Sequence, residues 1–216
     1  MHEELFQAMA QSVIDGESED AERLAREAIL VGIDPLEAIN KGFIVGVDYV
    51  GEHFSCGDLF LPDLVLAGEA MKTAVAVLEP EMARRGTRRE TLGKVVLGTV
   101  EGDIHDIGKT LVGTMLSASG FEVIDLGVNV PIDRLVQTAQ EVGADIVGVS
   151  ALLTTTMVKQ RTVVEKIKEA GLYPRVKVMV GGAPVTRDWA QQIGADGFSE
   201  DAIGAVGVAR QLVGKE

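Results

Sequence analysis

The run KVVLGTVEGDIHDIGK, residues 94–109, joins an apolar segment rich in β-branched residues to a polar loop and then to the start of a helical pattern. Three further apolar runs follow it: FEVIDLG at 121–127, ADIVGVS at 144–150 and RVKVMVGG at 175–182. Helical patterns lie between and after these runs, at 107–119, 132–142, 155–170 and 185–193. Such alternation is typical of a parallel sheet that is covered by helices on both faces.

A short fifth strand at 197–198 and a last helix at 201–212 complete this pattern. We therefore expect an α/β fold, a flavodoxin-like doubly wound parallel five-stranded sheet. Sheets of this kind bind ligands at the carboxyl ends of their strands, in the crevice where the strand order reverses.

The first part of the chain shows only helical periodicity. Four helices are predicted, at 3–14, 20–31, 35–54 and 62–83, with Asp34 as the N-cap of the third and Pro35 at its first position. Short connections between them favour an N-terminal four-helix bundle. The polar, basic stretch RRGTRRET at 84–91 is the best linker candidate, so we divide the chain into domains 1–88 and 89–216.

Charge and composition exclude several classes of function. The formal net charge of −13 over 216 residues disfavours binding to nucleic acid. No apolar run approaches the roughly 20 residues that span a bilayer, and the first residues lack the features of a signal peptide. We expect no membrane association and a cytoplasmic location. Cys56 is the single cysteine, so no intrachain disulfide can form.

The loop after the first strand carries the most informative residues. Its glycines match neither a G-x-G-x-x-G dinucleotide loop nor a P-loop, but Asp103, His105 and Gly108 form the pattern Asp-x-His-x-x-Gly. A histidine with a carboxylate two residues away suits a metal ligand whose other ring nitrogen is held by that carboxylate. One histidine is too few to hold a bare zinc ion, but it suffices for a metal whose other ligands come from a macrocycle. A lone loop histidine is otherwise most often a plain surface residue.

Two further features lie at the ends of the third and fourth expected strands. Ser150-Ala151-Leu152 follows the third, and the pair Gly181-Gly182 follows the fourth. Asp-x-His-x-x-Gly, Ser-x-Leu and Gly-Gly in this order resemble the cobalamin-binding domain of methionine synthase and of related corrinoid proteins. The second domain is accordingly expected to be a Rossmann-like cobalamin-binding domain.

The resemblance implies a role for each of these residues. His105 would be the lower cobalt ligand, replacing the benzimidazole base of the cofactor, with Asp103 hydrogen-bonded to it. Thr156 stands where a serine commonly supplies the hydroxyl behind that carboxylate. Ser150 and Leu152 would line the slot for the nucleotide tail, and the two glycines would let the backbone approach it closely. The remaining cofactor contacts implied are Gly102, Asp106, Gly108 and Thr154.

The resemblance extends to residues 51–62, GEHFSCGDLFLP, which are similar to the helical cap of the same family. There a phenylalanine and a leucine cover the methyl face of the corrin, and Phe54 and Leu61 are the matching positions. Apolar cover would keep water away from a reactive cobalt centre. Both side chains could equally be plain bundle core.

The cap and cofactor domain without further modules resemble the small corrinoid subunits of methanol, methylamine, glycine betaine and aryl methyl ether methyltransferases. Cobalamin or a related corrinoid, in its methylcobalamin form, is then the implied cofactor. The implied function is a methyl carrier that is not catalytic alone. A substrate-specific methyltransferase would pass a methyl group to Co(I). A second methyltransferase would move it to tetrahydrofolate or a thiol such as coenzyme M, and a reductive activator would rescue inactive cobalt.

Three other functions share this sequence pattern. The chain could be a cobalamin-dependent sensor or regulator, with the cap as a switch, although it contains no DNA-binding segment. It could be the small cofactor subunit of a radical mutase, which the cap speaks against. It could also be a flavodoxin-like module without any corrinoid. The methyl donor, the final acceptor and the oligomeric state are not readable from these residues.

Overall fold

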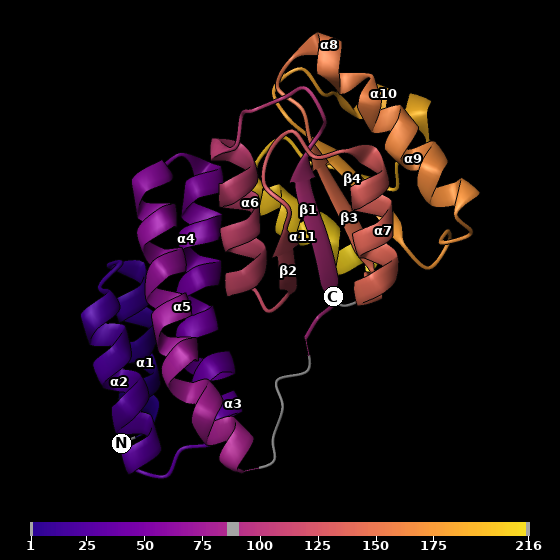
Figure 1. Ribbon diagram of the computed structural model, residues 1–216. Helices are drawn as coiled ribbons and strands as arrows, with labels where there is room; N and C mark the ends of the chain where they lie inside the picture. Colours follow the sequence, from indigo (N-terminus) through magenta and orange to yellow (C-terminus); the bar gives the residue numbers. More distant parts are fainter. Residues whose placement is uncertain (1, 86–90, 215–216) are drawn as a thin grey trace. The chain divides into compact units, whose positions relative to one another are not determined.

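A computed structural model describes residues 2–85 and 91–214 and divides the chain into two compact units, residues 1–90 and 91–216 (Figure 1). The domain boundary expected after residue 88, and most of the expected linker, lie outside the described residues.

The first unit is entirely helical where it is described. Its elements are α1 (His2–Ile14), α2 (Ser18–Leu30), α3 (Pro35–Ala38), the π-helical turn η1 (Ile39–Phe43), α4 (Ile44–Cys56) and α5 (Leu61–Arg84). Asp34 caps α3, because its carboxylate accepts hydrogen bonds from the backbone N–H groups of Leu36 and Glu37. From α3 through η1 to α4 the backbone stays helical, so the unit has the four helical rods that the periodicity predicts.

The π-helical turn between α3 and α4 was not expected, since the sequence reads as one regular helix from 35 to 54. The helix also runs on to Cys56, where Gly57 ends it in the left-handed conformation with φ 83°. Close packing of α1 against α4 relies on Gly46, where a Cβ would lie 2.4 Å from the carbonyl oxygen of Ala10. The fully buried side chains of the unit include Met9, Ile39, Phe43, Leu64, Met71 and Leu78.

The second unit is built around a parallel sheet. Its strands are β1 (Lys94–Thr99), β2 (Glu122–Asp125), β3 (Ile146–Ser150), β4 (Lys177–Gly181) and β5 (Gly197–Phe198). They pair in the order β2-β1-β3-β4-β5, and all pairs are parallel. The expected doubly wound five-stranded fold is therefore confirmed. The strand order reverses between β1 and β3, and the register places Thr99 beside Ser150 and Ser150 beside Gly181.

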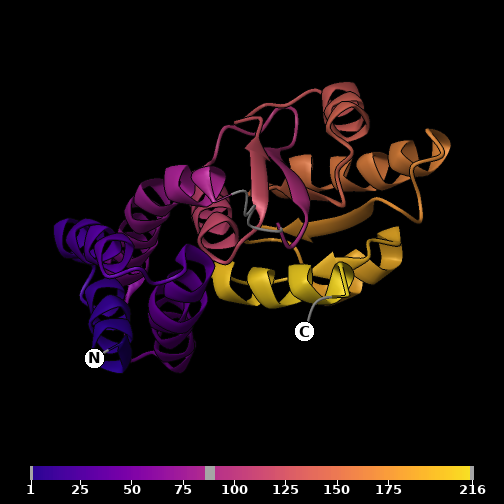
Figure 2. The same cartoon turned by 90° about the horizontal axis from the view of Figure 1, so that it is seen from below.

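Helices cover both faces of the sheet, as Figure 2 shows from below. They are α6 (Ile107–Ala118), α7 (Ile132–Val142), α8 (Thr154–Met157), α9 (Lys159–Glu169), α10 (Arg187–Ile193) and α11 (Ala202–Leu212). The apolar core against α7, α9 and α10 is formed by one side of the strands, which includes Val96, Val147, Val149, Val178 and Val180. On the opposite face Gly113 of α6 packs on Leu97, and Gly197 of β5 packs on Val208 of α11.

Two helix boundaries in this unit differ from the expected ones. The helix expected at 155–170 is interrupted at Val158, which separates the short α8 from α9. The helix expected from 185 begins at Arg187, because the Thr186 hydroxyl caps it by accepting a hydrogen bond from the Trp189 N–H.

Candidate functional site

The loop between β1 and α6 carries the Asp-x-His-x-x-Gly pattern and is held by hydrogen bonds to residues at the end of β1. The Thr99 hydroxyl, at the end of β1, donates a hydrogen bond to the carbonyl oxygen of His105 over 2.9 Å. The N–H of Asp103 donates to the carbonyl oxygen of Val100 over 3.1 Å. These two bonds fold the loop back on the strand end and fix the direction in which His105 leaves the backbone.

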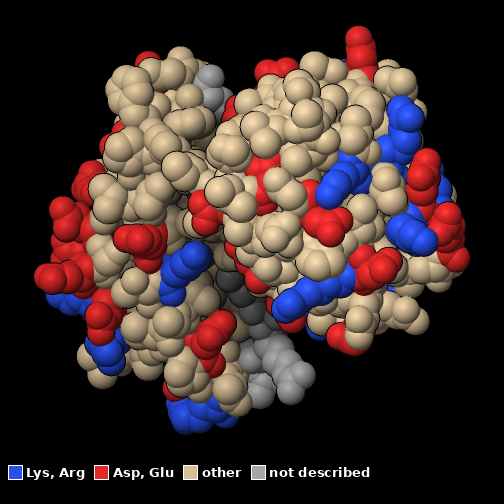
Figure 3. All heavy atoms as spheres, turned by 45° about the horizontal axis from the view of Figure 1, so that its top comes forward, with Lys and Arg blue, Asp and Glu red and all other residues tan. Residues whose placement is uncertain are grey.

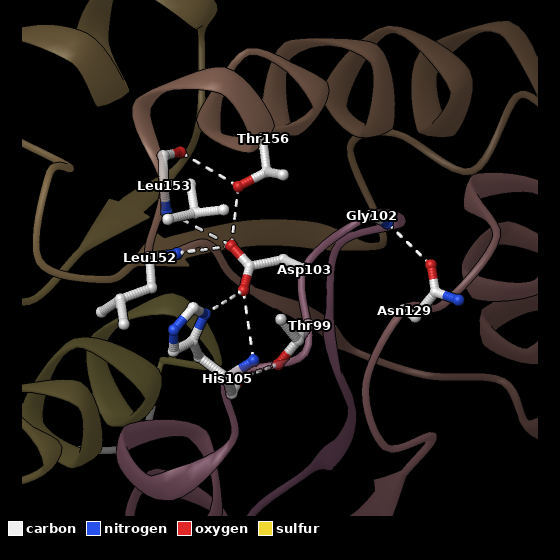
Figure 4. A network of polar contacts seen from close by, with 8 residues as sticks. All are labelled: Thr99, Gly102, Asp103, His105, Asn129, Leu152, Leu153 and Thr156. Carbon is white, nitrogen blue, oxygen red and sulfur yellow. Dashed lines mark hydrogen bonds and ion pairs between the residues drawn. The ribbon is translucent and has the colours of Figure 1, made fainter.

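His105 and Asp103 form the central contact of the site (Figure 4). Nδ1 of His105 lies 2.7 Å from Oδ1 of Asp103, and the backbone N–H of His105 donates to the same oxygen over 3.2 Å. The carboxylate is buried, whereas 47% of the His105 side chain is exposed. A carboxylate on Nδ1 holds the proton there, so Nε2 is the nitrogen with a lone pair to offer a ligand.

The other oxygen of Asp103 accepts three hydrogen bonds from the segment after β3. Oδ2 lies 2.8 Å from the N–H of Leu152, 3.3 Å from that of Leu153 and 2.6 Å from the hydroxyl of Thr156. Burial alone would raise the pKa of Asp103, but the hydrogen bonds from Thr156, His105 and the backbone outweigh it and hold the pKa far below its usual range. The buried carboxylate is therefore a stable anion beside the imidazole.

Asn129, which the sequence analysis missed, braces the loop from a third direction. Its side-chain oxygen accepts a hydrogen bond from the N–H of Gly102 over 2.7 Å (Figure 4). Its own backbone N–H donates to the carbonyl oxygen of Asp103 over 2.8 Å. Asn129 has a positive φ of 52°, a conformation that asparagine tolerates better than most residues. In the sequence, an asparagine two residues after a glycine indicates a turn. Nothing in the sequence indicates that this asparagine contacts Gly102.

Large exposed hydrophobic residues flank His105 in the chain, alongside the exposed Asp106. Ile104 and Ile107 are each 74% exposed, and the exposed large hydrophobic residues also include Leu152, Leu153 and Val158. Figure 3 brings this end of the α/β unit forward, and much of its surface there carries neither acidic nor basic side chains. Exposed apolar residues gathered around one polar ligand are typical of a surface that binds a large apolar group.

The residues predicted to line a slot lie at the adjoining ends of β3 and β4. Ser150 and Gly181 are register partners, and Leu152 is exposed just beyond β3. Gly182 has φ 122°, and a Cβ there would lie 1.9 Å from the carbonyl oxygen of Ala151. Only glycine permits this approach of the two chain segments.

The other residues predicted to contact the cofactor belong to both units. Gly102 lies in the His105 loop, Asp106 precedes α6, and Gly108 is in its first turn with open space where a Cβ would be. Thr154 is the first residue of α8 and is exposed. Phe54, half-buried in the last turn of α4, and Leu61, which is 41% exposed at the start of α5, belong to the helical unit.

These residues suit a macrocyclic metal cofactor better than a bare ion. Among the described residues, no group of three or more histidine, cysteine, aspartate or glutamate side chains could hold a metal. His105 instead offers one nitrogen, contacts the buried carboxylate of Asp103 and is flanked in the chain by the exposed Ile104 and Ile107. The fold and the site thus define a class: an α/β protein that binds a cofactor at the carboxyl ends of its parallel strands.

Comparison with known proteins identifies the family. A B12 binding domain model matches residues 93–207, and a second B12 binding domain model matches residues 5–79. The chain therefore belongs to the family of B12-binding corrinoid proteins, and its cofactor is a corrinoid, as the sequence predicts.

Curated relatives match over nearly the whole chain. A corrinoid protein of Desulfitobacterium hafniense is 46% identical over 98% of each chain. Trimethylamine corrinoid protein 1 of Methanosarcina acetivorans is 49% identical, also over 98% of each chain. Dimethylamine corrinoid protein 1 of Methanosarcina mazei is 48% identical over 99% of this chain and 98% of the relative.

Solved structures share the fold of both parts of the chain. The methanol:cobalamin methyltransferase complex of Methanosarcina barkeri matches with a TM-score of 0.86 and 30% identity, over 99% of this chain and 81% of that one. A cobalamin-binding protein of Desulfitobacterium hafniense matches with a TM-score of 0.80 and 37% identity, over 96% and 98%. In the described part of this chain, no helix is both long and apolar enough to cross a membrane.

Proposed function

We propose that the protein is the methyl carrier of a multi-component methyltransferase system and that His105 is the lower ligand of its cobalt. The contact between His105 Nδ1 and Asp103 Oδ1 carries this proposal. It leaves Nε2 available on a half-exposed ring at the carboxyl edge of the sheet, where open α/β sheets bind their ligands.

The residues around His105 prepare it for this role. Asp103 holds the proton on Nδ1 and raises the electron density at Nε2, and Thr156 holds Asp103 in place through its hydroxyl. The corrinoid itself supplies the methyl-transfer chemistry, since its cobalt can take up a methyl group and release it. The protein fixes where the ligand nitrogen stands and which nitrogen carries the proton.

We assign the remaining predicted residues to parts of the cofactor. Ser150, Leu152, Gly181 and Gly182 would border the nucleotide tail, because they surround the point where the ends of β3 and β4 approach each other. Contacts with the corrin and its side chains are assigned to Gly102, Asp106, Gly108 and Thr154.

The helical unit, residues 1–88 in this proposal, is the cap. Phe54 and Leu61 would cover the upper face of the corrin, and both stand at the connection between α4 and α5. Partner enzymes must reach that face, so the cap would have to move aside.

The partners are two methyltransferases and a reductive activator, all in the cytoplasm. The first would take its methyl group from a methylated amine. Support comes from the trimethylamine and dimethylamine corrinoid proteins, which are 47–50% identical to this chain. Among solved structures, the monomethylamine corrinoid protein of Methanosarcina barkeri is 36% identical and the chain of the methanol system is 30% identical. The second would use tetrahydrofolate or a thiol such as coenzyme M.

The ligand assignment is tested by electron paramagnetic resonance of the protein loaded with cob(II)alamin. Replacing ¹⁴N by ¹⁵N in histidine should change the nitrogen splitting of the cobalt signal from triplets to doublets. His105→Ala should abolish this isotope effect, and His53→Ala, a matched change in the helical unit, should preserve it. An isotope effect that persists in His105→Ala would refute the assignment.

The donor class is tested by methyl transfer to the loaded protein. Trimethylamine, dimethylamine and methanol methyltransferases are each offered with their substrate, and methylation is followed in the visible spectrum. We expect transfer from an amine enzyme and none from the methanol enzyme. Transfer from methanol alone would refute the amine proposal while leaving the carrier role intact.

A further inference from the structure

Gln160, the second residue of α9, is a fully buried polar side chain outside the His105 network. It has no exposed surface, and valines of β3 and β4 together with α9 form the apolar core on this face. Burying an amide in such a core is costly unless its polar atoms are hydrogen-bonded. The hydrogen bonds of the Gln160 amide explain why a glutamine is found at this buried position.

Those contacts join the ends of two strands. Nε2 of Gln160 donates to the carbonyl oxygen of Val149 over 3.0 Å and to that of Gly181 over 3.1 Å. These carbonyl groups lie at the carboxyl ends of the two strands, because β3 ends at Ser150 and β4 at Gly181. Both N–H groups of the amide are used, so its orientation is fixed by the two strand ends together.

The oxygen of the same amide is also engaged. Oε1 of Gln160 accepts a hydrogen bond from Nε1 of Trp189 in α10 over 3.1 Å, and the guanidinium of Arg161 lies 5.2 Å from the centre of that ring. Trp189 is the single tryptophan of the chain. The set of Gln160, Val149, Gly181 and Trp189, here named the strand-end brace, therefore ties α9 and α10 to the ends of β3 and β4.

Two members of the brace are neighbours, in the chain, of residues assigned to the nucleotide tail. Ser150 follows Val149, and Gly182 follows Gly181, which also accepts a hydrogen bond from the N–H of Ala151 over 3.1 Å. A small change in the spacing of the two strand ends would move Ser150 and Gly182 relative to each other. His105 belongs to a different loop, which is held by Thr99, Asp103 and Asn129.

We propose that Gln160 is a positioning residue that sets the spacing of the β3 and β4 ends for the nucleotide tail of the corrinoid. This inference rests on the proposed function. It assigns Gln160 to recognition of the tail rather than to ligation of the metal. Loss of the brace should then weaken binding of a complete cobalamin far more than binding of cobinamide, which has the same corrin ring and cobalt but no nucleotide tail.

The experiment measures the affinity of the full chain for cobalamin and for cobinamide by visible absorption. Gln160→Met keeps the volume of the side chain and removes its hydrogen bonds. We expect cobalamin binding to weaken about tenfold, the factor that corresponds to one lost hydrogen bond. Cobinamide binding should change less than about twofold, well within the effect of a single net hydrogen bond. Gln137→Met, on the exposed face of α7 where Gln137 contacts Glu141, is the matched control and should change neither affinity.

Tryptophan fluorescence of the corrinoid-free protein gives a second, independent measurement. Gln160→Met should shift the Trp189 emission because the indole N–H loses its partner, and Gln137→Met should not. Trp189→Phe keeps both hydrogen bonds from Gln160 to the strand ends. It should therefore weaken cobalamin binding less than Gln160→Met does, and again weaken it more than cobinamide binding. This variant carries the test if Gln160→Met does not fold.

The outcomes separate the two proposals. Equal weakening of cobalamin and cobinamide binding would show a merely structural role for Gln160, and unchanged affinities would show that the brace sets nothing; either result overturns the inference. Wild-type protein that binds neither corrinoid would overturn the proposed function itself.

Discussion

The hydroxyl of Thr156 lies 2.6 Å from the buried carboxylate oxygen Oδ2 of Asp103, although 53 positions separate the two residues in the chain. The same hydroxyl lies 3.0 Å from the carbonyl oxygen of Leu153, so its single proton serves one of two acceptors. Because the carboxylate is the charged partner, it forms the stronger hydrogen bond. This contact joins the first strand's loop to the short helix after the third strand.

Thr156→Val should destabilise the α/β unit by about 2 kcal/mol, the usual worth of a hydrogen bond to a buried charged group. Valine fills the same space but leaves Asp103 Oδ2 without its hydroxyl donor. Urea unfolding followed by Trp189 fluorescence measures this, since that residue reports on the α/β unit alone. Thr156→Ser keeps the donor and should be much closer to wild type; equal losses in both variants would contradict this explanation.

In the corrinoid-free protein, the tautomer of His105 with the proton on Nδ1 should be favoured over the other, because that nitrogen contacts Asp103 Oδ1. Nitrogen NMR of histidine-labelled protein distinguishes the two tautomers. Asp103→Asn presents an amide to several N–H donors and should shift the ring toward the other tautomer. His105 protonated on Nε2 in the wild type would contradict the geometry described.

Gly108→Ala should have opposite effects on stability and on cofactor binding. A Cβ there meets open space within a helix, so alanine should stabilise the corrinoid-free protein by about 0.5–1 kcal/mol. If the corrin occupies that space, its affinity should fall about tenfold or more, a change of at least 1.4 kcal/mol. Gly207→Ala in α11, where a Cβ also meets nothing, is the control and should stabilise without weakening binding. Unaltered affinity in Gly108→Ala would place the corrin elsewhere.

Gly182→Ala should destabilise the α/β unit by about 3 kcal/mol or more, as expected when backbone strain and a steric clash combine. Its φ of 122° is unfavourable for alanine, and the new Cβ would overlap the carbonyl oxygen of Ala151. Thermal unfolding with Trp189 as the probe measures the loss. A melting temperature equal to that of wild type would mean that the ends of β3 and β4 are not packed as described.

Glu81 should make the stability of the helical unit depend on acid. Hydrogen bonds from Arg84 and Arg85 lower the pKa of its carboxyl to about 2. A carboxyl with a lowered pKa in the folded state stabilises that state above its ordinary pKa, and the stabilisation disappears as the pH falls from there toward 2. Glu81→Gln should therefore lower the melting temperature at pH 6, and the difference from wild type should shrink by pH 2. A difference that does not depend on pH would contradict this assignment.

The sequence predicted most of the fold because its strands are continuous apolar runs and its helices are periodic. The π-helical turn at Ile39–Phe43 was missed, since the buried residues Ile39, Phe43, Val47 and Val50 keep the spacing of three or four that a regular helix also shows. The break at Val158 was also missed, because no glycine or proline marks it between Thr154 and Lys159.

The site was predicted in part. Asp103, His105 and Thr156 do meet, but the sequence alone links only the first two, and Thr156 came from the resemblance. Gln160 sits in the strongly polar segment KQRTVVEKIKE and reads as a solvent-facing residue. Its burial depends on where the carbonyl groups of β3 and β4 end, which is a property of the assembled sheet. The roles given to Phe54 and Leu61 stay predictions.

Three segments of the chain hold the loop of His105, and this has a consequence for the order in which the site can form. The loop of His105 has all its hydrogen bonds only when Thr99, Asn129 and the segment Leu152–Thr156 are in their folded positions. A nascent chain that has emerged only through its first two strands has no donors for Asp103 Oδ2. The contacts that hold His105 are therefore complete only after β3 and the residues that follow it have folded.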